Sequence, residues 1–276
     1  MILFVYKIIY GITRRLPPAV RYALSRLAAC WILRFIPDRR RVLIDNLAPL
    51  VGKERAEHLA PELLGNFLQT ASDLFCPPAS LASSTTLENW SLLDEAYRKT
   101  QRLIALTAHI GHWELGVSCL LNKGYAVTGL YAAYTDPAIV QWIHRHRDHR
   151  AEWFPATHGA AAACVAAVEK KRVVALVGDI PFGERGRRVS IAGHSARLPV
   201  GPWAIAVRTQ ATVIPAFILR ERPGHYRCII HPEIERPEGS FRYQIQTMQD
   251  AYAKLLEHYL QAYPEQWGVL QPFWEK

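Results

Sequence analysis

Apolar and polar residues alternate along this chain in two patterns that predict different elements. Short apolar runs predict strands, and they lie at Leu103–Thr107, Val127–Ala132, Val173–Val177, Thr212–Leu219 and Tyr226–His231. Longer stretches with helical spacing lie at residues 53–75, 113–122, 137–150, 159–171, 201–209 and 241–262. Strands that alternate with helices predict an α/β fold with a mainly parallel central sheet covered by helices.

The first 36 residues have a different pattern, because they are almost continuously apolar. Cations interrupt the run at Lys7, Arg14-Arg15, Arg21, Arg26 and Arg34, and Arg39–Arg41 follow it. An apolar helix with cationic flanks is typical of a segment that lies on an anionic membrane surface. We therefore expect a membrane-associating segment at 1–36 and a single catalytic domain at 37–276. A buried helix pair in a soluble domain is the alternative.

The composition narrows the choice of partner without fixing it. A net charge of +9 and a pI near 9.4 favour a partner with negative charge, such as phospholipid headgroups, an acidic carrier protein or nucleic acid. The basic residues do not interleave with aromatic ones as a base-stacking platform would, so nucleic-acid binding is only the leading non-enzyme alternative. Five scattered cysteines without a CxxC pair argue against a disulfide framework and favour a reducing, cytoplasm-facing setting.

The segment from Arg102 to Gly116 predicts a strand, a tight turn and a helix. His109 would lie at the carboxyl end of the strand and Glu114 in the first helical turn, where α/β sheets place their ligand crevice. Gly111 would let the Glu114 carboxylate return to the imidazole, fix its tautomer and leave the other ring nitrogen to accept a hydroxyl proton. A His-x4-acid pair is expected about once by chance in a chain of this composition. The case therefore depends on its context.

That context is a family resemblance. Residues 109–114, HIGHWE, resemble the His-x-Gly-Asn-Trp-Glu/Asp block of the late acyltransferases of lipid A biosynthesis. This family is a branch of the lysophospholipid acyltransferase superfamily, which also contains the phosphatidylinositol mannoside acyltransferases. Further blocks resemble the family in the same order, and they lie at Arg41 with Asn46-Leu47, Thr135-Asp136-Pro137 with Arg145 and Arg147, Val177-Gly178-Asp179 with Gly183 and Gly186, Gly193 through Pro215, and Tyr263 through Trp267 with Phe273-Trp274. The block from Gly193 resembles a hairpin and helix before the last core strand.

The resemblance implies an enzyme that moves a fatty acyl group from an acyl thioester to a hydroxyl of a membrane glycolipid of the lipid A precursor type. Acyl carrier protein or coenzyme A would carry the acyl group, no cofactor or metal would be needed, and the site would lie at the cytoplasmic face of the bacterial inner membrane. The tail at 268–272 resembles the mannoside branch more closely. Phosphatidylinositol mannoside-like and lysophospholipid acceptors are thus the alternatives, with a lipid-binding protein of degenerate fold as a further one.

Within this scheme the candidate catalytic residues are His109, Glu114 and Asp179. Asp179 follows an apolar strand, where it could orient a catalytic group or cap a turn. The candidate substrate-binding residues are His112, which replaces the usual Asn or Ser, and the cations Arg145, Arg147, Arg187 and Arg188. The cations could hold phosphate, or they could be solvated surface residues; Arg185 and the histidines near residue 146 invite the same two interpretations.

Other chemistries fit the sequence less well. His109, His112 and Glu114 lie close enough in the chain to bind zinc, but an HExxH motif is absent. Gly193 through Arg197 lacks the second glycine of a nucleophile elbow, which disfavours a serine hydrolase. Because a thioester is already activated, we expect direct transfer without a covalent acyl-enzyme.

Overall fold

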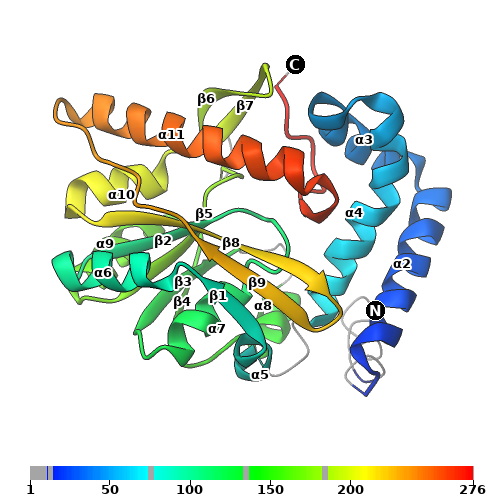
Figure 1. Cartoon of the computed structure of the whole chain (residues 1–276), viewed down its shortest axis with the longest axis horizontal. Helices are drawn as coiled ribbons and strands as arrows, with labels where there is room; N and C mark the ends of the chain where they lie inside the picture. Colours follow the sequence, from blue (N-terminus) through cyan, green and yellow to red (C-terminus); the bar gives the residue numbers. More distant parts are fainter. Residues whose placement is uncertain (1–10, 12–14, 74–77, 133–136, 182–185, 276) are drawn as a thin grey trace.

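The computed structural model describes residues 11, 15–73, 78–132, 137–181 and 186–275, and Figure 1 shows their arrangement. A seven-stranded sheet with the order β1-β9-β8-β2-β5-β3-β4 forms its centre. The antiparallel pair in this sheet is β8–β9, and the other neighbouring strands are parallel. The predicted mainly parallel α/β sheet is therefore confirmed.

The strands of the main sheet are β1 Thr85–Glu88, β2 Leu103–Thr107, β3 Val127–Tyr131, β4 Glu152–Pro155, β5 Val173–Val177, β8 Thr212–Arg222 and β9 His225–Ile230. A separate hairpin contains β6 Gly186–Ile191 and β7 His194–Pro199. The five predicted strands all form. The edge strands β1 and β4 were not predicted, because four residues are too few to show a period.

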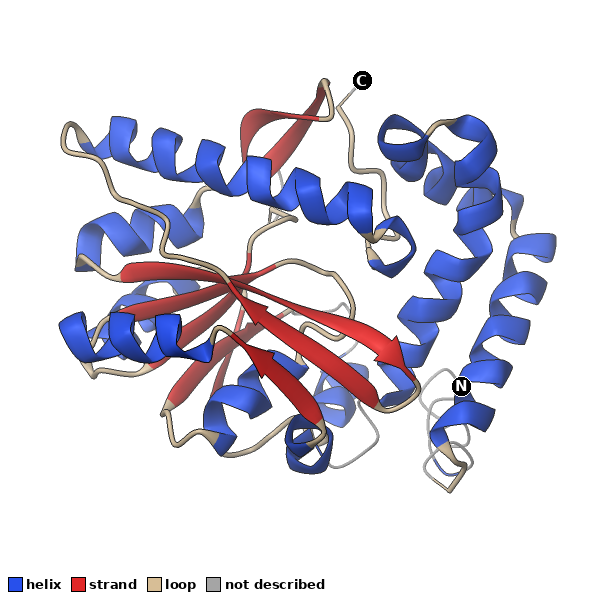
Figure 2. Cartoon of the chain, viewed as in Figure 1, coloured by secondary structure: helices blue, strands red, loops and turns tan. Residues whose placement is uncertain are grey.

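The helices are α2 Pro18–Phe35, α3 Pro37–Val51, α4 Lys53–Asp73, α5 Pro78–Ser83, α6 Trp90–Thr100, α7 Leu115–Asn122, α8 Pro137–His144, α9 Ala160–Glu169, α10 Gly201–Thr209 and α11 Phe241–Ala262, with the short 3₁₀ helix η1 at Pro264–Gln266. The helices cover both faces of the sheet, as Figure 2 shows. Each predicted helix forms, and its bounds differ from the expected ones by at most a few residues, except that α8 ends at His144 rather than near residue 150.

Alternation along the strands divides the core between the two faces. On β2, Ile104 and Leu106 pack toward α9, α10 and α11, whereas Leu103 packs toward α6 and α7. Successive strand side chains point to opposite faces, so a strand that is covered on both sides is apolar at nearly every position. The continuous apolar runs in the sequence have this origin.

The N-terminal helices form a third layer beside the sheet. Residues of α2, α3 and α4 share one core cluster, so packing crosses the boundary expected near residue 36. Within the described ranges, no helix is both long enough and apolar enough to cross a membrane. Residues 1–10 and 12–14, including Lys7, lie outside these ranges, as do Thr135, Asp136, Gly183 and Arg185.

Arg21 corrects one expectation about the N-terminal segment. It was expected as a surface cation, but it is buried, and its guanidinium pairs with the Asp73 carboxylate of α4 at 3.2 Å. Tyr22 and Tyr226 also donate hydrogen bonds to Asp73, and Arg220 of β8 lies 3.7 Å from it. A buried polar network therefore joins α2 and α4 to the sheet.

Candidate active site

The candidate site begins with the turn that follows β2. Gly111 has a φ of +59°, and a Cβ there would lie 2.0 Å from the carbonyl oxygen of Ile218, so the turn requires glycine. Its N–H donates to the carbonyl of Gln266 at 2.9 Å, and its carbonyl accepts from the Thr70 hydroxyl at 2.9 Å. Neighbouring elements thus fix the backbone that carries His109.

His109 and Asp179 meet because β2 and β5 are parallel neighbours. Thr107 pairs with Val177 in the sheet register, and each of the two site residues follows its strand by two positions. The His109 Nδ1 lies 2.8 Å from Asp179 Oδ1, and the His109 backbone N–H donates to Oδ2 at 3.0 Å. Since a carboxylate only accepts, Nδ1 carries the proton and Nε2 is left as the basic nitrogen.

This pairing corrects the expectation that Glu114 orients His109. The carboxylate hydrogen-bonded to His109 is that of Asp179, which is fully buried and also accepts from Trp267 Nε1 at 3.3 Å. The reason is strand order: β5 brings Asp179 to the imidazole, while Glu114 at the start of α7 has another partner. Asp179 therefore lies beside His109, just beyond the carboxyl ends of the neighbouring strands β5 and β2.

The electrostatic surroundings of His109 favour its protonated form. Burial lowers the pKa of His109, whereas the carboxylate of Asp179 and, more weakly, that of Glu114 raise it. The balance leaves the pKa of His109 above its ordinary value of 6.5. An imidazolium formed by taking a proton from a substrate would therefore be stabilised in this site.

Glu114 is paired with Arg147. The guanidinium donates two bonds to the carboxylate, at 3.0 Å from Nε and 2.5 Å from Nη2. It also lies 5.0 Å from the Trp153 ring centroid and 5.7 Å from that of Tyr131. Burial raises the pKa of Glu114, but Arg147, His112 and His109 lower it below its ordinary value. The pair holds the segment after α8 against the start of α7.

His112 is buried rather than presented at the surface. Its side chain is 2% exposed, neither ring nitrogen has a hydrogen-bond partner, and its ring lies edge-on to Tyr226 at 5.3 Å. Burial and the neighbouring Arg220 lower the pKa of His112 to about 4, although Asp73 opposes this shift. A small cavity is lined by both His112 and Glu114, so His112 remains a candidate substrate contact through that cavity.

The other four candidate substrate-binding residues do not form one cluster of contacts. Arg145 is exposed just beyond α8, and Arg147 is held by Glu114. On β6, Arg187 donates to Gln249 and Asp250 of α11, and Arg188 pairs with Glu275 at 2.7 Å. The structure therefore brings Arg147 into the site and gives Arg187 and Arg188 partners on α11 and at the C-terminus.

The C-terminal segment contributes to the site in a way that the sequence analysis missed. Trp267 donates to Asp179, and the Gly268 N–H donates to the His109 carbonyl at 2.6 Å. Asn46 of α3 holds this segment by donating to the carbonyls of Val269 and Gln271 at 3.2 and 2.8 Å. The two blocks that resembled the family at Asn46 and Trp267 were the signal that could have linked them.

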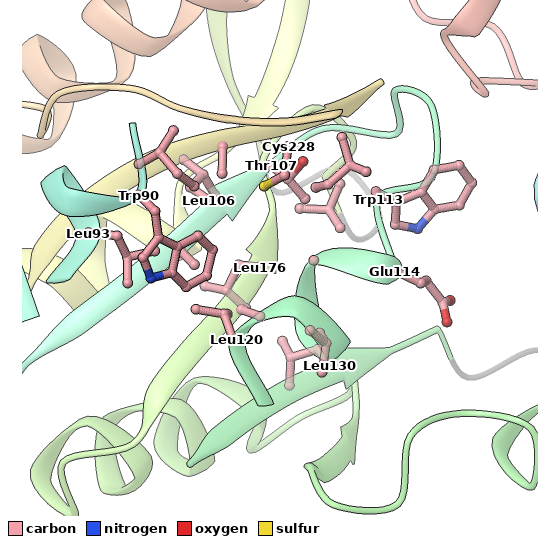
Figure 3. Close-up of a pocket in the computed structure, with 18 of the residues that line it drawn as sticks. Trp90, Leu93, Leu106, Thr107, Trp113, Glu114, Leu120, Leu130, Leu176 and Cys228 are labelled. Atoms are coloured by element: carbon pink, nitrogen blue, oxygen red, sulfur yellow. The ribbon is translucent and has the colours of Figure 1, made fainter. Parts of the chain in front are cut away.

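An apolar cavity of about 650 Å³, including its open mouth, lies beside the His109 turn (Figure 3). It extends between α7 and the face of the sheet that packs toward α6 and α7, and Thr107, Trp113 and Glu114 line one end. The Trp113 ring also contacts the His109 ring edge-on at 4.9 Å. Trp113 thus lies between the imidazole of His109, which it contacts, and a space suited to an apolar chain, which it lines.

Metal binding would need several ligating side chains that lie together in the described part of the chain. There, no group of three or more His, Cys, Asp and Glu side chains is arranged to hold a metal ion. His109, His112 and Glu114, which the zinc interpretation would combine, instead face Asp179, Tyr226 and Arg147.

Comparisons with known proteins point to one family. The phosphatidylinositol mannoside acyltransferase of Mycolicibacterium smegmatis is 24% identical over 189 residues, which cover 67% of this chain and 59% of the relative. A Mycobacterium tuberculosis protein of the same name is 24% identical over 186 residues, covering 66% of this chain and 57% of the relative. The matched part thus spans less than two thirds of these relatives. A family model described as bacterial lipid A biosynthesis acyltransferase matches residues 1–276, and the chain therefore belongs to that family.

Proposed function

We propose that this protein transfers a fatty acyl group from an acyl thioester to a hydroxyl of a membrane glycolipid. The observation that carries the proposal is the His109–Asp179 pair beside an apolar cavity at the carboxyl end of the sheet. The family and the relatives named as mannoside acyltransferases support it. Lipid A precursors and phosphatidylinositol mannoside-like lipids are the two acceptor classes to compare.

The proposed reaction uses His109 as general base. Its Nε2 takes the proton from the acceptor hydroxyl while the oxygen attacks the thioester carbonyl. The carbon–sulfur bond then breaks, and the imidazolium returns the proton to the departing thiolate. Asp179 holds the Nδ1–H tautomer and stabilises the imidazolium, so that the role expected of Glu114 passes to Asp179. Glu114, which lines one end of the cavity, instead pairs with Arg147.

The proposed donor binds with its acyl chain in the cavity, because apolar lining residues would take the chain out of water. Transfer is direct, with no acyl-enzyme, since His109 needs no protein nucleophile to use a thioester. Either acyl carrier protein or coenzyme A fits as the carrier, and the exposed Arg145 is the candidate for its phosphate. Arg187 and Arg188 would have to release acidic partners to take this role.

The proposed location is the cytoplasmic face of the bacterial inner membrane, with α2 lying on the anionic surface. Apolar side chains spaced three or four residues apart form a stripe on the exposed face of α2, at Val20, Leu24, Leu27, Trp31 and Phe35. Such a stripe beside the cations Arg39–Arg41 suits the boundary between headgroups and acyl chains.

The test combines purified protein with each carrier thioester and each acceptor class in mixed vesicles. Mass spectrometry should find one additional acyl group on one glycolipid class, and initial-rate plots with both substrates varied should intersect. Parallel lines, or an acyl group retained on the protein, would contradict direct transfer. If no hydroxylated lipid is acylated from either thioester, the proposed function is wrong.

A further inference from the structure

The apolar cavity beside the turn that carries His109 is elongated, and different elements line its two ends. Trp113 and Glu114 lie at one end, and Trp90 and Leu93 of α6 lie at the other, as Figure 3 shows. Between these ends, side chains of α7 and of the strands form walls that are almost entirely apolar. A linear chain that enters beside Glu114 would therefore advance toward Trp90.

Small residues on adjacent strands make room for this cavity. Ala105 of β2 pairs with Ala175 of β5, and both remain partly accessible although their strands are central in the sheet. Ala175 also pairs with Gly129 of β3, where a Cβ would lie 2.5 Å from the Trp153 ring. Larger residues at these positions would fill the space between the sheet and α7. Ala105 and Ala175 thus line the cavity directly, and Gly129 makes room for Trp153, which also lines it.

The side chain that closes the far end is held in place. Trp90 Nε1 donates to Asp94 at 3.0 Å, one turn further along α6, and Asp94 also accepts from the Tyr125 hydroxyl. The Trp90 and Tyr125 ring centroids are 6.4 Å apart, and the Lys123 Nζ lies 5.8 Å from the Trp90 ring. Trp90 is itself only half-buried.

We propose that Trp90 is the stop that sets the longest acyl chain this protein accepts. The inference rests on the proposed function, because it assumes that the cavity holds the acyl chain of the donor. Each methylene that cannot enter stays in water, which lowers affinity about fourfold. Because Trp90 lines this end of the cavity and is only half-buried, shortening its side chain would extend the cavity at this end.

The test measures acyl-chain preference with a series of saturated thioesters of increasing length. Trp90→Ala should move the preferred length upward, and thioesters two methylenes beyond the wild-type limit should gain about 15-fold in kcat/KM. Leu93→Phe should narrow the same end and move the preference to shorter chains. Tyr97→Ala is the matched control, because Tyr97 is on the same helix and contacts Tyr125 at 5.0 Å but does not line the cavity.

A second measurement separates this inference from the proposed function. Fatty acids of each length are used to displace a fluorescent fatty acid from the full chain without any acceptor. A shift of the length limit in Trp90→Ala supports the stop even if no lipid is acylated, in which case only the proposed reaction fails. An unchanged limit in a folded Trp90→Ala protein, an equal shift in Tyr97→Ala, or no binding of any chain by the wild type would overturn the inference.

Discussion

Two acidic residues of the site have separate partners, and this division determines what each can do. Asp179 is fully buried and holds the imidazole of His109, whereas Glu114 holds the guanidinium of Arg147. A carboxylate on Nδ1 fixes the tautomer and raises the basicity of Nε2. A carboxylate paired with Arg147 instead holds the loop after α8 in place. The two residues should therefore differ in the way their loss changes the pH dependence of the rate.

We expect Asp179→Asn to lower kcat/KM by about 10²-fold or more and to shift its pH dependence. His109 must be neutral to act as base, so the rate rises with pH through the pKa of His109. Asp179 raises this pKa, and its loss should move the rising limb to lower pH. Rate profiles from acid to mildly alkaline pH measure the shift. Glu114→Gln is the comparison and should move the limb less; an equal or opposite shift would contradict these roles.

His112 should make the fold sensitive to acid. Its pKa falls from 6.5 when unfolded to about 4 when folded, so folding favours the neutral form. The free energy of unfolding should therefore decrease as pH falls from about 6.5 to about 4, by up to about 3 kcal/mol from this residue. Denaturant unfolding at several pH values, compared between wild type and His112→Asn, isolates the effect. Identical acid sensitivity in the two proteins would show that His112 does not titrate in this way.

At the residue scale, the sequence predicted that His109 and Asp179 follow strands, but it did not predict that they pair with each other. His109 and Asp179 both follow apolar strands, so their positions at the carboxyl end of the sheet were predictable. The choice of Asp179 over Glu114 as the partner of His109 was not, because it depends on β5 lying next to β2. Strand order arises from packing across the whole sheet and leaves no local pattern. The burial of Arg21 escaped notice for the same reason, since its partner Asp73 lies in another helix.

At the scale of elements, the C-terminal segment connects α3 to the site. Asn46 of α3 donates to two carbonyls of this segment and accepts from the Phe273 N–H at 3.1 Å. The same segment carries Trp267, which donates to Asp179. The long predicted elements appeared where their periodicity was strong, whereas this irregular segment has no period. In the sequence, only its resemblance to a block of the family indicated that this segment could matter for the site.

We expect Asn46→Ala to destabilise the protein by about 2–3 kcal/mol, because it leaves buried backbone groups without partners. Hydrogen exchange should quicken at the amides of residues 267–274, while the central strands keep their protection in the native state. Gln261→Ala on the exposed side of α11 serves as the control and should change neither quantity. Unaltered exchange of the C-terminal amides in Asn46→Ala would mean that other contacts hold this segment.

At the scale of the whole molecule, α2 combines an attached face with an exposed one. Arg21 and Tyr22 on its attached face belong to the buried Asp73 network, so deleting residues 1–36 would remove partners of Asp73 as well as the exposed apolar stripe. Substitutions on the exposed face are therefore the cleaner way to test membrane docking, because they leave the core intact.

We expect the Leu27→Ser, Trp31→Ser, Phe35→Ser variant to bind vesicles of anionic phospholipid at least tenfold more weakly than the wild type. These side chains are 58%, 63% and 70% exposed, so their main loss is apolar contact with lipid rather than with the core. Vesicle co-sedimentation measures the change, and added salt should weaken binding through Arg39–Arg41. Phe241→Ser, Tyr243→Ser on α11 is the matched control. Equal losses in both variants would locate the docking surface elsewhere.

The central claim is that His109, held by Asp179, deprotonates the acceptor hydroxyl. The most direct test is a double-mutant cycle on acyl transfer with His109→Ala, Asp179→Asn and the combined variant, each checked for folding by thermal unfolding. His109→Ala should lower the rate by about 10²-fold or more. Adding Asp179→Asn to it should cost little further, because Asp179 acts through the imidazole. Full turnover by folded His109→Ala, or losses that multiply independently, would contradict the account.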